Sequence, residues 1–112
     1  MDSLTFITHC LSFEEAIEQA HFEKTSFRVN KKIFATLSIE KNSATLKLSE
    51  IDQSVFCAFN PEQIKPATGA WGKQGWTIFE LTTLKEEMII DALTLSYCKV
   101  APQKLSEKHN RN

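Results

Sequence analysis

The clearest pattern in the chain lies between residues 25 and 48, where apolar and polar residues alternate with a period of two. Phe27 and Val29, for example, alternate with Ser26 and Arg28. Alternation of this kind, rich in β-branched and aromatic residues, is typical of strands with one buried face. We therefore expect three consecutive antiparallel strands in this stretch.

Burial also predicts how the first two strands pair. A three-residue loop at 30–32 would place Val29 opposite Ile33 and Phe27 opposite Ala35, so that all four apolar residues share one face. A two-residue loop would put a lysine into the apolar row instead. The three-residue loop is therefore the expected one.

The same reasoning applies to the second turn. A four-residue loop at 40–43 would place Leu37 opposite Leu46 and Ala35 opposite Leu48. With both loops in place, the apolar residues of the three strands lie on one side. The pattern predicts a sheet with one face covered by helices and the other face open.

A helix is expected over residues 3–20, because apolar residues recur there every three or four positions. The residues of this stripe are Phe6, Cys10, Phe13 and Ile17. An alternative is that Ser12 and Glu15 form a capping box that starts a shorter helix.

Several elements are expected after the meander. Ser49 is a suitable N-cap for a helix over 50–59, with Ile51, Val55, Phe56 and Phe59 as its apolar face and Asn60–Pro61 as its end. A short edge strand at 64–66, a glycine-containing loop at 67–73, a strand at 74–81 and a helix at 84–105 follow. The inward face of the strand at 74–81 stays open, because both of its alternating sets are apolar. Thr83 is the expected N-cap of the last helix, and Pro102 should kink or end it.

The expected order is helix, three strands, helix, two strands, helix (α-β-β-β-α-β-β-α). Strand and helix runs without βαβ alternation predict an α+β fold of two layers, an antiparallel sheet with helices on one face. The chain has 112 residues, which suits one domain, expected over 1–105, with a polar tail at 106–112.

The overall composition narrows the class of protein. The formal net charge is −1, so there is no general attraction to nucleic acid or anionic membranes. The N-terminus does not resemble a signal peptide, and no segment has the roughly 20 apolar residues of a membrane span. We expect a cytoplasmic monomer without membrane contact. Cys10, Cys57 and Cys98 have no CxxC spacing and are expected to be buried free thiols, ahead of metal ligands or a redox pair.

No motif indicates catalysis or a cofactor. Gly69, Gly72 and Gly75 precede a predicted strand, whereas a phosphate-binding glycine loop opens a helix. His9, His21 and His109 lack metal-ligand spacing, and no nucleophile has a recognisable signature. We expect a protein that is not an enzyme and has no metal or cofactor.

The open sheet face is the most informative surface for function. The expected register groups Arg28, Phe34 and Lys47 there, and an exposed aromatic beside basic residues can stack on a base while its phosphate is bound. The candidate nucleic-acid-binding residues are Arg28, Lys31, Lys32, Phe34, Lys47, Trp71 and Lys73. The competing interpretation is structural, with Phe34 under a loop, the tryptophans in the core and the lysines serving solubility.

Four separated motifs resemble the MmcQ/YjbR family over about Leu11 to Leu105. They are SFRVNKKIFATL (26–37), LKLS (46–49), WGKQGWT (71–77) and YCKVAPQKL (97–105). The chain departs from the family at Glu14, where a proline commonly follows LSF. The resemblance implies a secretion-chaperone-like two-layer α+β fold in the same element order.

The resemblance also implies DNA binding by two hairpin "wings", here around 30–32 and 41–43. A fold does not fix a function, however. The leading hypothesis is a small bacterial protein that binds DNA through basic hairpins of the open face. The alternative is a module that binds a protein or a small molecule through the Trp71–Trp76 region.

Overall fold

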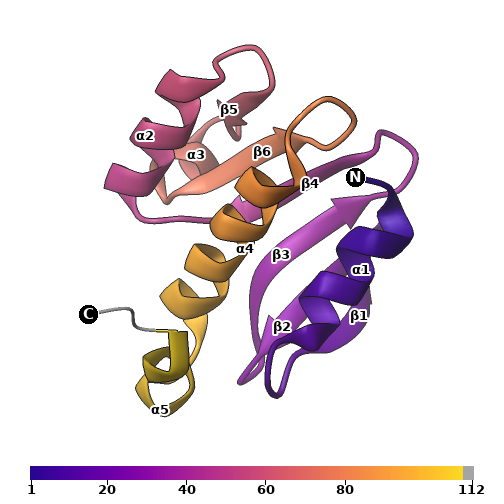
Figure 1. The fold of residues 1–112 in the computed structure, drawn as a ribbon, viewed down its shortest axis with the longest axis vertical. Helices are drawn as coiled ribbons and strands as arrows, with labels where there is room; N and C mark the ends of the chain where they lie inside the picture. Colours follow the sequence, from indigo (N-terminus) through magenta and orange to yellow (C-terminus); the bar gives the residue numbers. More distant parts are fainter. Residues whose placement is uncertain (110–112) are drawn as a thin grey trace.

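The computed structural model describes residues 1–109, and its strands form one six-stranded antiparallel sheet in the order β1-β2-β3-β4-β6-β5 (Figure 1). The elements are α1 (Ser3–Ser12), β1 (Ile17–His21), β2 (Lys24–Val29), β3 (Lys32–Ser38), β4 (Ser43–Lys47), α2 (Glu50–Phe59), β5 (Ile64–Pro66), α3 (Ala70–Lys73), β6 (Trp76–Glu80), α4 (Glu86–Val100), α5 (Gln103–Ser106) and the 3₁₀ turn η1 (Glu107–His109). The expected α+β class is confirmed, with one additional strand at the N-terminal edge of the sheet.

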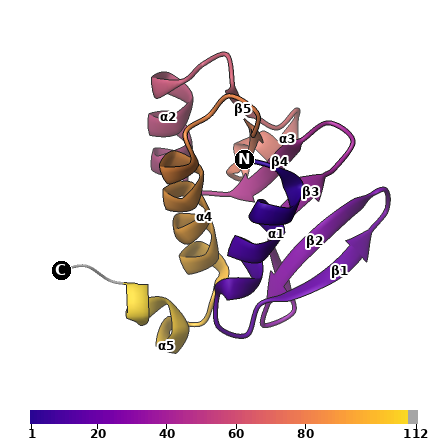
Figure 2. The same cartoon turned by 45° about the vertical axis from the view of Figure 1, so that its right-hand side comes forward.

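Helices α1, α2 and α4 lie on the same side of the sheet (Figures 1 and 2). Each contributes an aromatic contact: Phe6 of α1 meets Phe27 at 6.0 Å between ring centroids, and Tyr97 of α4 meets Phe34 at 5.6 Å. Phe56 of α2 packs on Phe79 in the same way. The largest fully buried side chains belong to this layer: Tyr97, Phe6, Phe27, Phe34, Phe79, Leu37, Leu46, Leu48, Ile64, Leu81, Ile89 and Leu93.

The first helix is shorter than the sequence pattern predicted. It ends at Ser12, and residues 17–21 form strand β1, so the expected helix over 3–20 was wrong in its second half. The chain leaves the helix because Phe13 stacks on Tyr97 at 4.5 Å, and the Tyr97 hydroxyl donates a hydrogen bond to the Glu14 carbonyl. The alternative capping-box helix starting at Ser12 does not form either.

The β2–β3 hairpin corrects the predicted loop. Asn30 and Lys31 form a two-residue turn with φ values of 51° and 68°, as in a type I′ hairpin, and Val29 pairs with Lys32 rather than Ile33. The expected pair of Phe27 with Ala35 is nevertheless present.

A β-bulge reconciles these two observations. Arg28 pairs with Ile33 and the preceding residue, Phe27, pairs with Ala35, so Phe34 is an extra residue on β3. A bulge lets two successive side chains turn to one side of a sheet. Phe34 and Ala35 are both fully buried, whereas the loop prediction had assumed strict alternation.

The β3–β4 turn keeps the predicted face but shifts the register by two residues. Leu37 pairs with Ala44 and Ala35 pairs with Leu46, because the four-residue loop spans 39–42 rather than 40–43 and Ser38 pairs with Ser43. An even shift leaves every side chain on its original side. The inward positions of β4 were therefore predicted correctly despite the wrong partners.

The remaining elements follow the sequence closely, except for one capping error and for the short helix α3, which lies within the predicted loop at 67–73. Helix α2 has the predicted bounds, and the Ser49 side chain accepts a hydrogen bond from the Asp52 N–H. Helix α4 begins at Glu86 after Lys85, so the predicted N-cap at Thr83 was wrong. The predicted helix over 84–105 ends at Val100 before Pro102 and resumes as the short α5.

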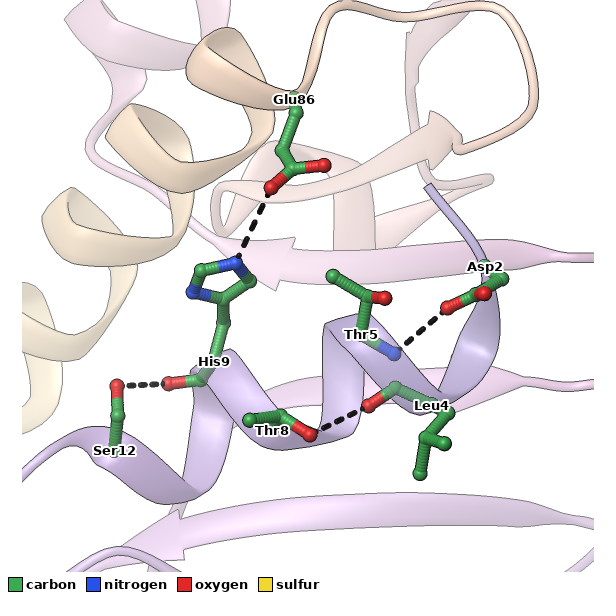
Figure 3. Close-up of polar contacts among 7 residues, drawn as sticks. All are labelled: Asp2, Leu4, Thr5, Thr8, His9, Ser12 and Glu86. Atoms are coloured by element: carbon green, nitrogen blue, oxygen red, sulfur yellow. Dashed lines mark hydrogen bonds and ion pairs between the residues drawn. The ribbon is translucent and has the colours of Figure 1, made fainter.

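Helix α1 is fixed at its start and along its length (Figure 3). The Asp2 carboxylate caps it by accepting from the Thr5 N–H at 2.8 Å. The His9 ring points toward Glu86 of α4, with 3.6 Å between Nε2 and the carboxylate oxygen. The His9–Glu86 contact links α1 to α4 across the helical layer.

We predict that Ser96→Ala destabilises the fold. The buried Ser96 hydroxyl donates to the Phe34 carbonyl and accepts from the Lys47 N–H at 3.0 Å, so its removal leaves two buried backbone groups unpaired. The expected loss is about 1–3 kcal/mol in the free energy of unfolding, measured by urea denaturation. Ser54→Ala, at an exposed position of α2, is the control and should change little. Equal stability of both variants would contradict this role.

Glu80 should contribute stability that depends on pH. Its carboxylate accepts from the Thr83 hydroxyl and from the Thr82 and Thr83 N–H groups, and these bonds lower its pKa to about 2. Because the folded-state pKa lies below the ordinary value, the contribution is complete above that value and is lost as pH falls toward 2. Glu80→Gln should therefore be less stable than the parent at neutral pH, and the difference should shrink in acid. Glu40→Gln, in an exposed turn, should show no such convergence.

Candidate functional site

The face of the sheet opposite the helices carries small polar, basic and aromatic side chains. We call this the open face and define it by Ser26, Arg28, Thr36, Thr45, Lys47, Trp76 and Ile78. Strand alternation and the observed pairs Ser26–Thr36, Thr36–Thr45, Thr45–Ile78 and Lys47–Trp76 place these residues together. Arg28 and Lys47 therefore share one face, as predicted.

Arg28 is oriented by its neighbours on this face. Its Nε donates to the Ser26 hydroxyl at 3.2 Å, and that hydroxyl donates to the Gln19 carbonyl at 2.8 Å. The bond uses only one of the five guanidinium N–H groups. The other donors are available for an anionic ligand.

Lys47 is held more firmly than Arg28. Its Nζ donates to the Gln74 carbonyl at 2.6 Å and lies 5.5 Å from the centre of the Trp76 ring. Partial burial, with a smaller contribution from the nearby Lys99, lowers the pKa of Lys47. Lys47 thus joins β4 to the loop before β6 and covers one side of Trp76.

Phe34 does not lie on the open face, and its predicted role in stacking on a base was wrong. Its side chain is 0% exposed and packs edge-on against Phe13 at 6.1 Å and Tyr97 at 5.6 Å. The bulge turns it inward. Among the aromatic residues of the predicted site, Trp71 on α3 is exposed, at 64%.

The two predicted wings lie at opposite ends of the sheet. In a meander, successive hairpins point in opposite directions, so the turn at Asn30–Lys31 and the turn around Lys41 are separated by the length of β3. Seven residues of strand span about 20 Å. The Lys31 end also carries Lys32, whereas Lys41 follows Glu40. The basic residues therefore concentrate at one end.

Helix α3 presents the other two predicted site residues. Trp71 and Lys73 are both exposed on this single helical turn, and the following carbonyl, of Gln74, binds Lys47. Gly75 adopts a φ of 99° and lies so close to β4 that a Cβ atom would approach the Leu48 carbonyl oxygen to 1.9 Å. Gly75 therefore permits close packing of this loop at the end of β4, whereas Gly72 packs against Ala67.

The groups with catalytic potential have structural partners. His9 pairs with Glu86, His21 packs on Phe22 at 4.9 Å, and His109 packs on the rings of Phe13 and Tyr97. Burial strongly raises the pKa of the Cys10 thiol, which keeps it protonated. Within residues 1–109, no three side chains of the metal-binding types come together. None of the helices in this range is long and apolar enough to traverse a bilayer.

The model of the YjbR family matches residues 11–99, which is most of the chain. The chain belongs to the YjbR family. The fold agrees with this assignment: the crystal structure of Deinococcus radiodurans protein DR2400, a DUF419 domain, superimposes with a TM-score of 0.81 at 18% identity. The match covers 96% of this chain and 86% of that one. No curated protein matches the sequence.

Sequence reasoning missed several exposed residues of this YjbR protein. Lys65 pairs with Ile78 beside the open face, and Phe22 is 95% exposed with a φ of 59° at the β1–β2 turn. Helix α2 also exposes most of its apolar positions. No local pattern distinguishes an exposed apolar residue from a buried one, because both follow the same periodicity.

We predict that Gly75→Ala is more destabilising than Gly69→Ala. Both glycines have positive φ, so alanine strains the backbone at each site, by about 1–3 kcal/mol. At Gly69 a Cβ meets nothing within 4 Å, whereas at Gly75 it clashes with the Leu48 backbone. The excess loss in unfolding free energy for Gly75→Ala therefore measures the packing of the loop on β4. Equal losses would show that this close approach is relaxed in solution.

Proposed function

We propose that this YjbR protein is a non-enzymatic, monomeric cytoplasmic protein that binds DNA, with unpaired bases preferred over duplex. The observation that carries the proposal is the clustering of basic and aromatic side chains at one end of the open face. Arg28, Lys47 and Trp76 lie on adjacent or near-adjacent strands there, and exposed Trp71 and Lys73 follow from α3.

The basic residues would contact phosphates. Lys31 and Lys32 extend from the β2–β3 turn at the same end as Arg28, and all three have donors directed to solvent or free for a ligand. Lys73 supplies a further positive charge beside Trp71. Lys47 acts mainly by orienting Trp76 and the Gln74 carbonyl, since its Nζ is already engaged.

The preference for single strands follows from the arrangement of the hairpins and the aromatic side chain. The two hairpins point to opposite ends of β3, so they do not form one pair of wings for a duplex. Trp71 is exposed and can stack on an unpaired base, an interaction worth about 1–3 kcal/mol. Stacking of this kind tolerates any base, so we propose little sequence preference.

A second candidate function is binding of a small molecule beside α3. A hollow of about 540 Å³ lies there, and its lining includes Glu50, Gln53, Gly72 and Lys73. It combines both signs of charge with backbone groups, which suits a small polar ligand. A ligand that shifts tryptophan fluorescence where DNA does not would favour this alternative.

The DNA proposal predicts binding that weakens steeply with salt. A fluorescent oligothymidine of about 15 nucleotides should bind at low ionic strength. A plot of the logarithm of the affinity against the logarithm of the salt concentration should have a slope of about −3 if four phosphates are contacted. The double variant Lys31→Ala/Lys32→Ala should reduce this slope by about 1 to 2. Fluorescence anisotropy over a salt series measures both quantities.

Two further variants make this test specific to the site. Trp71→Ala should weaken binding by about 1–3 kcal/mol with an unchanged salt slope, because it removes stacking and no charge. Lys104→Ala, on exposed α5, is the matched charge control and should bind like the parent. Absence of binding at low salt, or equal losses for Lys104→Ala and the turn variants, would refute DNA binding at this surface.

A further inference from the structure

Helix α2 exposes an apolar stripe that the fold does not use. Ile51, Val55 and Phe59 are 75%, 60% and 74% exposed, and their spacing of four residues aligns them along one side of the helix. The sequence pattern had predicted that these residues, with Phe56, face the core. Only Phe56 turns inward, against Phe79.

The stripe borders a groove between α2 and α4, the two helices that lie apart on the helical side of the sheet (Figure 1). The groove has a volume of about 760 Å³. Val55 belongs to both the stripe and the groove, and Phe56 and Leu95 add apolar walls. Large apolar side chains exposed in a row beside a groove, rather than singly, are a feature of interaction sites.

The charges around this surface are acidic. Asp52 on α2, Asp91 on α4 and Glu107 on η1 line the groove, and the remaining titratable groups in its lining are His109 and the Cys98 thiol. Helix α2 itself contains Glu50 and Asp52 but no basic residue. An occupant must therefore present apolar anchors together with positive charge.

We propose that the α2–α4 groove binds an amphipathic helix of another protein, with apolar anchors at helical spacing flanked by lysine or arginine. An amphipathic helix laid into an apolar groove is a common mode of peptide recognition. Its apolar side would cover Val55, Phe56 and Leu95, and its basic residues would face Asp52 and Asp91. This surface is separate from the open face, so it serves a partner other than DNA.

A second copy of this chain is a poorer occupant on electrostatic grounds. Antiparallel pairing of two α2 helices would bring the acidic first turn of each against the negative end of the other helix dipole, close to Glu62. No basic residue of α2 would compensate for this repulsion. Charge complementarity therefore selects a basic partner.

The test uses two synthetic helical peptides and the full chain. Each peptide has about 14 residues with leucines at positions 1, 4, 5, 8 and 12, and the other positions are mostly lysine in one and glutamate in the other. The lysine peptide should bind at least about tenfold more tightly than the glutamate peptide in fluorescence anisotropy. Val55→Ser and Asp91→Asn should each weaken its binding several-fold.

Leu4→Ser is the matched control, since Leu4 is also an exposed apolar residue, on α1 and outside the groove, with 74% exposure against 60% for Val55. It should bind the lysine peptide like the parent. Circular dichroism of each variant shows whether it is folded, and all three substituted positions are exposed. Equal affinity for the two peptides, or parent-like binding by Val55→Ser, would overturn the proposal.

Sedimentation velocity tests the remaining possibility, which is that a second copy of this chain covers the stripe. The parent protein should be monomeric without the peptide at the concentrations used for binding. A dimer that Val55→Ser converts to monomer would mean that a second copy covers the stripe, and it would overturn the basic partner. Because the DNA assay uses variants at Lys31, Lys32 and Trp71, either proposal can fail while the other stands.

Discussion

The bulge at Phe34 is the constraint on which the rest of the structure depends. The extra residue breaks the ladder between β2 and β3, so its ring turns into the core against Phe13 and Tyr97. Its carbonyl accepts from Ser96, and the same hydroxyl receives the N–H of Lys47. One irregular residue thereby joins α4 to two strands.

The position of the bulge also explains why the basic residues gather at one end. The two-residue turn at Asn30–Lys31 is compatible with buried Val29 and Phe27 only because the bulge at Phe34 adds one residue to β3. The extra residue shifts the alternation of inward and outward side chains on β3 by one position. The tight turn places Lys31 at its tip and Lys32 at the start of β3, at the end of the sheet where Leu48 binds Gly75. Trp71 and Lys73 lie at the same end of the sheet, because α3 comes just before the start of β6.

Much of the fold could be predicted from periodicity because each correct element was specified locally. Helix α2 had a capping serine and a stop at Asn60–Pro61, and β4 kept its inward residues even with the wrong partners. The errors required long-range information. Helix α1 ends where Phe13 stacks on Tyr97, which lies 84 positions later in the sequence. The bulge depends on the contacts of Phe34 with Ser96 and with the same tyrosine. Phe34 was therefore misplaced, while Arg28 and Lys47 were assigned to the correct face.

Although the net charge is only −1, basic and acidic residues are concentrated in different parts of the chain, and this matters for both proposed surfaces. Residues 24–47 hold six basic residues, Lys24, Arg28, Lys31, Lys32, Lys41 and Lys47, against the single acidic Glu40, whereas α2 holds two acidic residues and no basic one. Fields at the protein surface decay over about 8–10 Å at ordinary ionic strength. Arg28 and Lys47 lie across the sheet and the helical layer from the α2–α4 groove, and each layer is about 10 Å thick. Lys73 is the exception, because it lines a hollow together with Glu50 of α2. Each surface therefore presents its local charge to a partner, and the near-zero total does not argue against binding at either.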